Sequence, residues 1–321
     1  MTVYIHQLPD WPLFRWDYGA LSEQLAAVRH RRGCLVRRME SLESSLRAEA
    51  ILQTLTLDVL KSSEIEGETP NHATITFSFL KNEVRSSIAR HLGMDIDGLV
   101  PSDRNVEGVV EMKLDATQNY DKPMNKERLF AWHGDLFPTG SSSMSKIIAG
   151  AWRKKPTQVI YGQSDRQRVL FEAPDAERLK EEMAAFFNWF NGEDDTASVL
   201  RAGIAHLWFV TIHPFDDGNG RIARALSDML LARSEQSSQL FYSMSAQIRQ
   251  ERESYYEMLE CAQKGTLDIT EPLRWFLGCM GRALDNVDAL STSIVAEAYS
   301  ASLNRGNIFP CASPICSFKT F

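Results

Sequence analysis

The chain of 321 residues is 44% hydrophobic and 24% charged, a composition typical of a globular protein with a full hydrophobic core. Its net charge of −7 disfavours nucleic-acid binding, because phosphate contacts need clustered Lys and Arg side chains. The five scattered cysteines match neither a disulfide framework nor a zinc site. No apolar run is long enough to cross a membrane, and no signal peptide is recognisable, so we expect a cytoplasmic protein.

The N-terminal half of the chain is predicted to be mostly helical. Residues 1–16 are rich in Pro and aromatic side chains and are expected to be extended. Apolar residues then recur with a period near 3.6, which predicts helices over 18–30, 33–66, 83–92, 103–119 and 125–137. Gly67 and Pro70 end the second of these helices, and residues 69–82 are predicted to form a loop or a short strand.

The C-terminal half begins with the signal for a β-hairpin. Two short apolar runs, 159–161 and 169–172, flank a polar turn and predict a β-hairpin. A lone hairpin is marginal in water, so we expect it to pack on the body or to offer an edge to a partner strand. Helices are predicted over 174–191, 196–212, 220–234, 245–264 and 271–290. The fold class is therefore mainly α, with an irregular tail over 291–321.

Residues 213–224, HPFDDGNGRIAR, combine groups that a fold alone rarely requires. Pro214 ends the apolar helix before it, and the next helix is predicted to begin near Gly220. A Gly-rich loop that leads into a helix N-terminus binds anions, since free N–H groups point outward and the helix dipole favours negative charge. Gly218 and Gly220 allow the backbone to approach a phosphate closely.

The charged groups of this stretch favour a polyphosphate. Arg221 and Arg224 share one face of the helix. Asp216 and Asp217 would repel phosphates unless a divalent cation lay between them, and Mg²⁺ is commonly held by carboxylates together with substrate phosphates. His213 is placed to act as a general base. Each feature alone is more often structural, but their combination within twelve residues favours a functional site.

This stretch resembles the signature of the Fic family, HPFx(D/E)GNGRxxR, at every defined position. The resemblance implies a Fic-type helical bundle with a small β-hairpin flap. It also implies a protein adenylyltransferase (AMPylase), a nucleotidyltransferase that moves AMP from ATP to a Ser, Thr or Tyr hydroxyl of a target protein. Gly220 argues against the related phosphotransfer branch, which has a lysine there. Transfer of UMP or phosphocholine, known among relatives, stays open.

The resemblance assigns a role to each remaining residue of the signature. It implies that His213 is the catalytic base and that Asp217 holds Mg²⁺, with Asp216 a less certain ligand. It implies that the loop and two arginines hold the phosphates of ATP; these nucleotide-binding residues are Gly218, Asn219, Gly220, Arg221 and Arg224. The hairpin at about 158–172 resembles the flap on which target proteins dock, and His133 is expected to be structural.

A second motif, SSEIEG at 62–67, resembles the inhibitory motif of the same family. Its defined positions are Ser62, Glu66 and Gly67. The resemblance implies that Glu66 pairs with Arg224 and occupies the arginine meant for the γ-phosphate, so that the protein inhibits itself. The implied organisation is an N-terminal helical region over 1–105 with an inhibitory helix at about 33–66, then a catalytic core over 106–290. The tail at 291–321 is too short for the winged helix of many relatives.

Other functions remain open at this point. Glu66 could instead activate water for removal of AMP from a modified protein, or the chain could be a non-catalytic module that senses nucleotide. Tyr255 and Tyr256 either wall an adenine pocket or belong to the core. The expected partners are ATP and an unidentified target protein, with self-modification and homo-oligomer formation open. A DNA-binding regulator is disfavoured by the charge.

Overall fold

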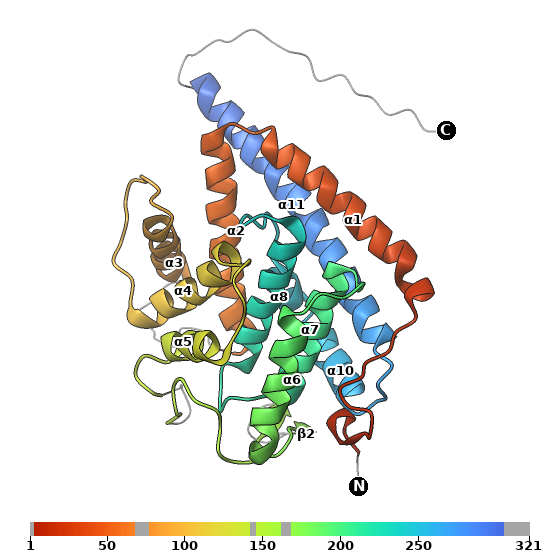
Figure 1. The fold of residues 1–321 in the computed structure, drawn as a ribbon. Coiled ribbons are helices and arrows are strands. Elements are labelled where there is room, and N and C mark those ends of the chain that lie inside the picture. The colour runs from red at the N-terminus through yellow and green to blue at the C-terminus, as the bar shows by residue number, and fades with distance from the viewer. Residues whose placement is uncertain (1–2, 68–76, 142–145, 162–167, 305–321) are drawn as a thin grey trace.

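The computed structural model describes residues 3–67, 77–141, 146–161 and 168–304. Within these ranges the chain consists of helices and one two-stranded antiparallel sheet, which confirms the predicted mainly α class with a hairpin (Figure 1). In this part of the chain, no helix combines the length and the apolar character needed to cross a membrane.

The N-terminal helices pack around the remainder of the chain. A short 3₁₀ turn, η1, covers Ile5–Gln7. It is followed by α1 (Tyr18–Glu40), α2 (Ser44–Ile65), α3 (Phe77–His91), α4 (Arg104–Gln118) and α5 (Lys126–Leu136). In Figure 1, α1 runs along the blue C-terminal helix α11, while α3, α4 and α5 gather on the opposite side of the molecule.

The rest of the chain supplies the hairpin and the central helices. Its strands are β1 (Gln158–Tyr161) and β2 (Arg168–Glu172), followed by a 3₁₀ turn, η2 (Ala176–Arg178). The helices are α6 (Leu179–Asn191), α7 (Ser198–Ile212), α8 (Asn219–Glu235), α9 (Met244–Gln250), α10 (Arg252–Gln263) and α11 (Thr270–Asn304).

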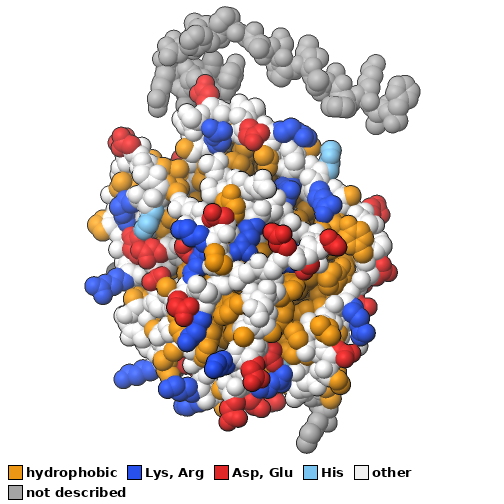
Figure 2. All heavy atoms as spheres, in the orientation of Figure 1, with side chains coloured by type: hydrophobic (Ala, Val, Ile, Leu, Met, Phe, Trp, Pro, Cys, Tyr) orange, Lys and Arg blue, Asp and Glu red, His pale blue; other side chains and the backbone are white. Residues whose placement is uncertain are grey.

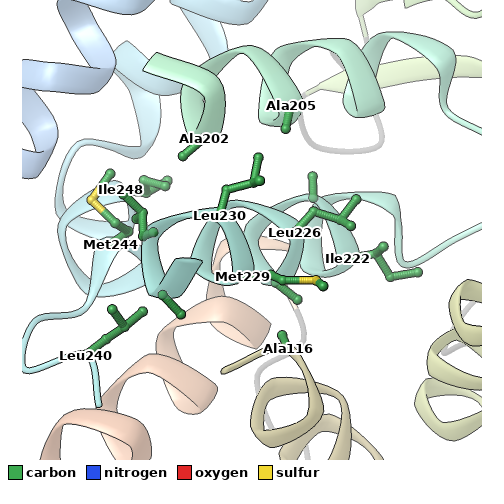
Figure 3. Close-up of a cluster of buried hydrophobic side chains, with 14 of the residues drawn as sticks. Ala116, Ala202, Ala205, Ile222, Leu226, Met229, Leu230, Leu240, Met244 and Ile248 are labelled. Carbon is green, nitrogen blue, oxygen red and sulfur yellow. The ribbon is translucent and has the colours of Figure 1, made fainter. Parts of the chain in front are cut away.

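The core is centred on the antiparallel pair α7 and α8. Nearly every residue of α7 is buried, as its continuous apolar sequence predicts. Figure 3 shows Ala202 and Ala205 of α7 facing Leu226 and Leu230 on α8. Small side chains on one helix opposite large ones on the other allow close approach of the two axes. The loop that joins α7 to α8 is thereby attached to two deeply buried helices.

The C-terminal end of α2 reaches this core from the N-terminal region. α2 packs along α9 and α3 and also contacts α8.

On the face drawn in Figure 2, basic and acidic side chains are interspersed, with apolar groups exposed between them. That face carries no continuous basic stripe of the kind that would follow a phosphate backbone.

Gly108 marks a close crossing of α4 over α5. A Cβ placed on Gly108 would lie 1.8 Å from the carbonyl oxygen of Asp135. We expect Gly108→Ala to lower the free energy of unfolding by about 1–3 kcal/mol, because backbone atoms must move apart. Gly33→Ala in α1 is the matched control, since its Cβ would meet nothing within 4 Å and helix propensity predicts a gain of up to ~1 kcal/mol. Urea unfolding should therefore show a lower free energy of unfolding for Gly108→Ala and a higher one for Gly33→Ala, each relative to wild type.

The predicted helix break near residues 31–32 is wrong. α1 continues through Gly33 to Glu40, and the break falls at 41–43, so the helix expected to be inhibitory corresponds to α2, residues 44–65. One glycine costs a helix only about 1 kcal/mol, and burial of Leu35 and Met39 in the same helix outweighs that cost. Ser41 Oγ donates to the carbonyl of Arg38 and caps the end of α1.

Three other boundaries differ from prediction. Residues 77–82 belong to α3 instead of a loop or strand, and 69–76 lie outside the described residues. The helix predicted at 245–264 is two helices that meet at Glu251, whose carboxylate binds Arg282 of α11 (2.6 Å) and so redirects the chain. Residues 291–304 continue α11, because no glycine or proline falls between 282 and 305; the rest of the predicted tail is outside the described residues.

Candidate active site

His213 forms the C-terminal cap of α7 in a left-handed conformation, with φ of 51°. Pro214 excludes the α conformation at the preceding residue, as predicted, and the chain turns sharply into the loop. The imidazole Nδ1 lies 3.2 Å from the carbonyl oxygen of Val210. A carbonyl only accepts, so Nδ1 carries the proton and Nε2 keeps a lone pair. His213 is therefore oriented as a base.

The protonation state of His213 suits the same role. Burial lowers its pKa to about 4, and the positive charge of Arg153 acts in the same direction. Glu66 and Asp217 act in the opposite direction but do not overcome burial. The imidazole is consequently neutral at pH 7 and able to accept a proton.

Arg153, which the sequence analysis missed, ties the loop to the hairpin. Its side chain is 1% exposed. Nε donates to the carbonyl of His213 (2.8 Å), Nη1 to that of Lys155 (2.9 Å) and Nη2 to that of Pro174. Its backbone N–H donates to Pro214 O (3.0 Å). Lys155 is a near neighbour, but His213 and Pro174 lie 60 and 21 positions away, so no local spacing could have revealed this arginine.

His133 of α5 packs against the loop between α7 and α8. Its ring stacks on Phe215 at 4.0 Å between centroids and 8° between planes. Nδ1 accepts from the backbone N–H of Gly150 (2.9 Å), so Nε2 carries the proton and lies 3.3 Å from the carbonyl of Asp217. The side chain is fully buried, and burial lowers its pKa to about 4. This contact set supports the structural role expected from the sequence.

The folded protein should lose stability in acid partly through His133. Its pKa in the fold is lower than the ordinary 6.5, so its contribution is fully present above pH 6.5 and is lost as the pH falls toward 4. Between pH 7 and pH 5 this loss amounts to about 2 kcal/mol. We expect His133→Gln, measured by urea unfolding at both pH values, to remove that part of the decline. An unchanged pH difference would contradict the assignment.

Asn219 closes the loop with its side chain. Oδ1 accepts from the N–H of Phe215 (3.0 Å), and Nδ2 donates to the carbonyl of the same residue (2.9 Å). α8 begins at Asn219, one residue earlier than predicted, with Gly218 as N-cap at φ of 79°. A Cβ on Gly218 would lie 2.8 Å from the ring of Phe137. The side chain of Asn219 thus shapes the loop, and the first amides of α8 have no partner within their own helix, as the predicted anion site requires.

The two aspartates of the loop differ in their surroundings. Asp217 Oδ1 accepts from the N–H of Gly218 (2.6 Å), which orients the carboxylate beside the helix N-terminus. Asp216 is exposed. A carboxylate offers about four lone-pair directions, so Asp217 can hold a cation as well. One carboxylate next to a phosphate-binding loop fits Mg²⁺, which is usually bound by one or two carboxylates and substrate phosphates.

The two arginines of the signature are buried on α8. The guanidinium of Arg221 lies over the ring of Phe137, 5.0 Å from its centroid. Arg224 is 1% exposed and turns toward α2. Its Nε donates to Ser62 Oγ (3.0 Å), and its Nη2 donates both to the Ser62 carbonyl (2.8 Å) and to Glu66 Oε1 (2.7 Å). The pair that the sequence analysis expected between Glu66 and Arg224 is thus present.

The Glu66 carboxylate lies directly against the first turn of α8. A Cβ on Gly220 would be 2.0 Å from Glu66 Oε1 and 3.2 Å from Arg224 Nη1. Glu66 is the C-cap of α2, and Gly67 follows at φ of 81°, a conformation that favours glycine. Burial opposes the charge on Arg224, but the charge and hydrogen bond of Glu66, together with Tyr255 and Tyr256, outweigh burial and raise the pKa of the guanidinium.

α10 holds the end of α2 in place. Arg252 Nε donates to the carbonyl of Ile65 (2.9 Å), and Tyr256 OH lies 3.3 Å from the same oxygen. Tyr255 is 2% exposed, and its hydroxyl lies 2.8 Å from Nε2 of His206. Of the two tyrosines, Tyr255 therefore belongs to the core.

A buried ion group links α2 to α8 further from the loop. Lys113 Nζ lies 2.6 Å from Asp58 of α2 and 2.6 Å from Asp228 of α8. Asp58 also accepts from Ser243 Oγ (2.6 Å). The burial of Asp228 raises the pKa of its carboxyl to about 6. This group, also missed in the sequence, joins residues 58, 113 and 228 only in the folded chain.

The chain combines a helical fold, a central helix pair joined by an HPF…GNGR loop, and a hairpin next to that loop. This combination is typical of a Fic-type domain. Residues 123–231 match the Fic/DOC family, and residues 4–94 match a domain of unknown function, DUF4172. The central part of the chain therefore carries a Fic/DOC family domain.

Curated relatives share this central domain. Over 105 residues the chain is 36% identical to proteins named protein adenylyltransferase Fic from Culex quinquefasciatus and Drosophila melanogaster. The match covers 32% of this chain and about a fifth of the relatives' length (19% and 20%).

Solved structures share the fold over a longer range. A Fic family protein from Desulfovibrio desulfuricans superposes with a TM-score of 0.61 at 22% identity, covering 85% of this chain and 75% of that one. A Fic domain containing signaling protein from Bacteroides thetaiotaomicron gives 0.58 at 17% identity, with coverages of 85% and 97%. Residues 134–508 of Fic-1 from C. elegans give 0.55 at 22% identity, with coverages of 85% and 74%. These likenesses support the Fic-type helical fold.

Proposed function

We propose that the protein is a protein adenylyltransferase that transfers AMP from ATP to a hydroxyl of a target protein and is restrained by Glu66. The observation that carries the proposal is one juxtaposition. The loop between α7 and α8 begins with a neutral, oriented His213 and ends at the N-terminus of α8. Glu66 of α2 lies against this first turn at Gly220 and forms an ion pair with the buried Arg224 of α8. The names of the curated relatives support the same activity.

In this mechanism His213 Nε2 accepts the proton of the target hydroxyl. The hydroxyl oxygen attacks the α-phosphorus, a new P–O bond forms, and the bond to the β-phosphate oxygen breaks. The products are a phosphodiester on the target and pyrophosphate. Because Nδ1 is fixed on the Val210 carbonyl, the base does not need to reorient during the step.

The loop and α8 bind the nucleotide. The first amides of α8 face the α- and β-phosphates, Arg221 binds the β-phosphate and Arg224 the γ-phosphate. Asp217 would hold Mg²⁺, which would supply positive charge to neutralise the phosphates. These contacts are electrostatic and preformed, and preorganised donors of this kind supply much of the rate enhancement in phosphoryl-type transfer.

Glu66 restrains the reaction by occupying Arg224. Its Oε1 lies 2.0 Å from the position that a Cβ of Gly220 would take, at the helix start that the phosphates need. A nucleotide that cannot use Arg224 or the first turn of α8 is bound with its α-phosphate displaced from the line of attack. The brake belongs to α2, and so to the region that matches the domain of unknown function.

The reverse reaction is the second candidate. The Glu66 side chain is 27% exposed, so its carboxylate can reach water while it remains bonded to Arg224. In that role Glu66 would activate water to remove AMP from a modified protein. The two functions differ in the effect of Glu66→Gly, which should release transfer but abolish removal.

The deciding experiment supplies Mg²⁺ and ATP labelled at the α-phosphate to wild type, Glu66→Gly and Glu66→Gly/His213→Ala. Label on protein in Glu66→Gly alone is the expected result. If Glu66→Gly stays unlabelled both alone and with cell lysate, the transfer proposal is wrong, and removal of AMP from a labelled substrate is tested next. Self-modification appears as label on the chain itself. A homo-oligomer and a cytoplasmic location stay predictions.

A further inference from the structure

The N-terminal segment lies against the hairpin of β1 and β2, called the flap below. His6, in the turn η1, is 5% exposed. Its Nε2 lies 2.9 Å from the carbonyl oxygen of Glu172 in β2, so Nε2 carries the proton and donates to it. Burial lowers the pKa of His6, which keeps the ring neutral with this single donor. The two residues are 166 positions apart in the chain.

This hydrogen bond falls on the outer edge of β2. The N–H of Ala173 donates to the carbonyl of Thr157 (3.0 Å), so that pair faces across the two strands. The next pair is Gln158 opposite Glu172. Backbone groups alternate in direction along a strand, so the carbonyl of Glu172 points away from β1. His6 therefore occupies the edge to which another strand would have to bond.

Aromatic packing joins the same segment to the flap. The rings of Tyr4 and Phe171 meet edge to face at 5.1 Å, and those of His6 and Phe171 at 5.6 Å. Phe171 is fully buried, although a two-stranded hairpin cannot bury a side chain by itself. The N-terminal segment thus completes a small core beneath β2, separate from the main one.

The segment is itself firmly attached to the body. Trp11 Nε1 donates to Glu182 of α6 (2.8 Å). Arg15 exchanges backbone hydrogen bonds with Leu267 and Ile269, both at 2.8 Å. It can consequently act as a fixed support. Within the ranges that the structure describes, the outward backbone groups of Gln158 in β1 bond to no other residue, in contrast to the edge of β2.

We propose that residues 4–7 position the flap: they occupy the outer edge of β2 and leave the outer edge of β1 to receive an incoming protein strand. The contacts above support the part of the proposal in which residues 4–7 hold the flap. The part in which β1 receives a target strand rests on the proposed function. The segment belongs to the region that matches the domain of unknown function, which thereby contributes both the brake and the support of the flap.

Hydrogen exchange of the intact protein tests the holding role without any activity. We expect His6→Ala to increase exchange at the Ala173 amide and at the paired amides of β1 and β2 by about fivefold, the effect of losing one hydrogen bond. His6→Gln, whose amide nitrogen can reach the same carbonyl, should restore the wild-type rate. His91→Ala is the matched control, because His91 makes a 2.9 Å bond to the carbonyl of Ser87, in α3 and away from the flap. Wild-type exchange in His6→Ala would overturn the proposal.

Transfer in the Glu66→Gly background tests the docking role. His6→Ala should lower the labelling of target protein in lysate several-fold, while the dissociation constant for ATP and the release of AMP into water stay unchanged. Unchanged labelling together with faster flap exchange would refute the docking role. If the Glu66→Gly background labels nothing, the proposed function fails, and the exchange result still decides whether residues 4–7 hold the flap.

Discussion

Glu66→Gly should increase the initial rate of AMP transfer by about 30- to 100-fold over wild type. Arg224 is 1% exposed and bonded to Glu66 at 2.7 Å. Separating a buried arginine from its carboxylate costs about 3–5 kcal/mol, and the partial exposure of Glu66 reduces this to about 2–3 kcal/mol. ATP binding must break this pair in the wild type but not in the variant. Each step of about 1.4 kcal/mol corresponds to a factor of ten in rate, which gives the stated ratio. Incorporation of α-labelled AMP into protein measures the change.

The same substitution should make the protein less stable until nucleotide binds. Loss of Glu66 leaves Arg224 with Ser62 as its remaining partner on α2, so we expect the free energy of unfolding to fall by about 1–3 kcal/mol. ATP should then raise the melting temperature more in the variant than in wild type. Glu64→Gly is the control, because Glu64 pairs with Lys61 (2.7 Å) instead of Arg224. Equal activation by both substitutions would mean that loosening of α2, and not the carboxylate, is responsible.

His213→Ala in the Glu66→Gly background should reduce transfer by about 10²- to 10⁴-fold, the usual contribution of a general base. The imidazole is oriented by Val210 and lies outside the phosphate-binding turn, so ATP affinity should change less than twofold. The comparison of initial rates with nucleotide dissociation constants separates the two effects. His30→Ala, on the surface of α1, is the control substitution.

The pH profile of transfer gives His213 a second signature. Its pKa of about 4 lies below the ordinary value, so Nε2 can accept a proton throughout the range from pH 6 to 8. Activity should be flat there and fall as the pH approaches 4. Loss of Glu66 removes a negative charge that favours protonation, so the acid limb should not move upward in the activated variant. A decline centred near pH 6.5 would show that the base is more exposed than the structure has it.

The chemistry of the site could be predicted from the sequence because its groups are contiguous. Residues 213–224 contain the base, the glycines and both arginines, so a local motif specifies them together. The helices of the core were predicted from periodicity, since a buried stripe repeats every 3.6 residues whatever packs against it. The breaks between helices were not: Gly33 lies inside α1, and α9 meets α10 at Glu251, where a side chain of α11 holds the turn.

The sequence by itself determined which groups lie together in the loop at 213–224, because the base, the glycines and the arginines of the proposed chemistry are close together along the chain. The tertiary structure alone decided how these groups are held and restrained. Arg153 joins the loop at His213 to Pro174 beside the hairpin, the Asn219 side chain bonds to the backbone of its own loop, and His6 supports a strand 166 residues away. The Glu66–Arg224 pair joins residues 158 positions apart. Such contacts leave no spacing in the sequence, since burial and chain crossing fix them only after the helices have packed.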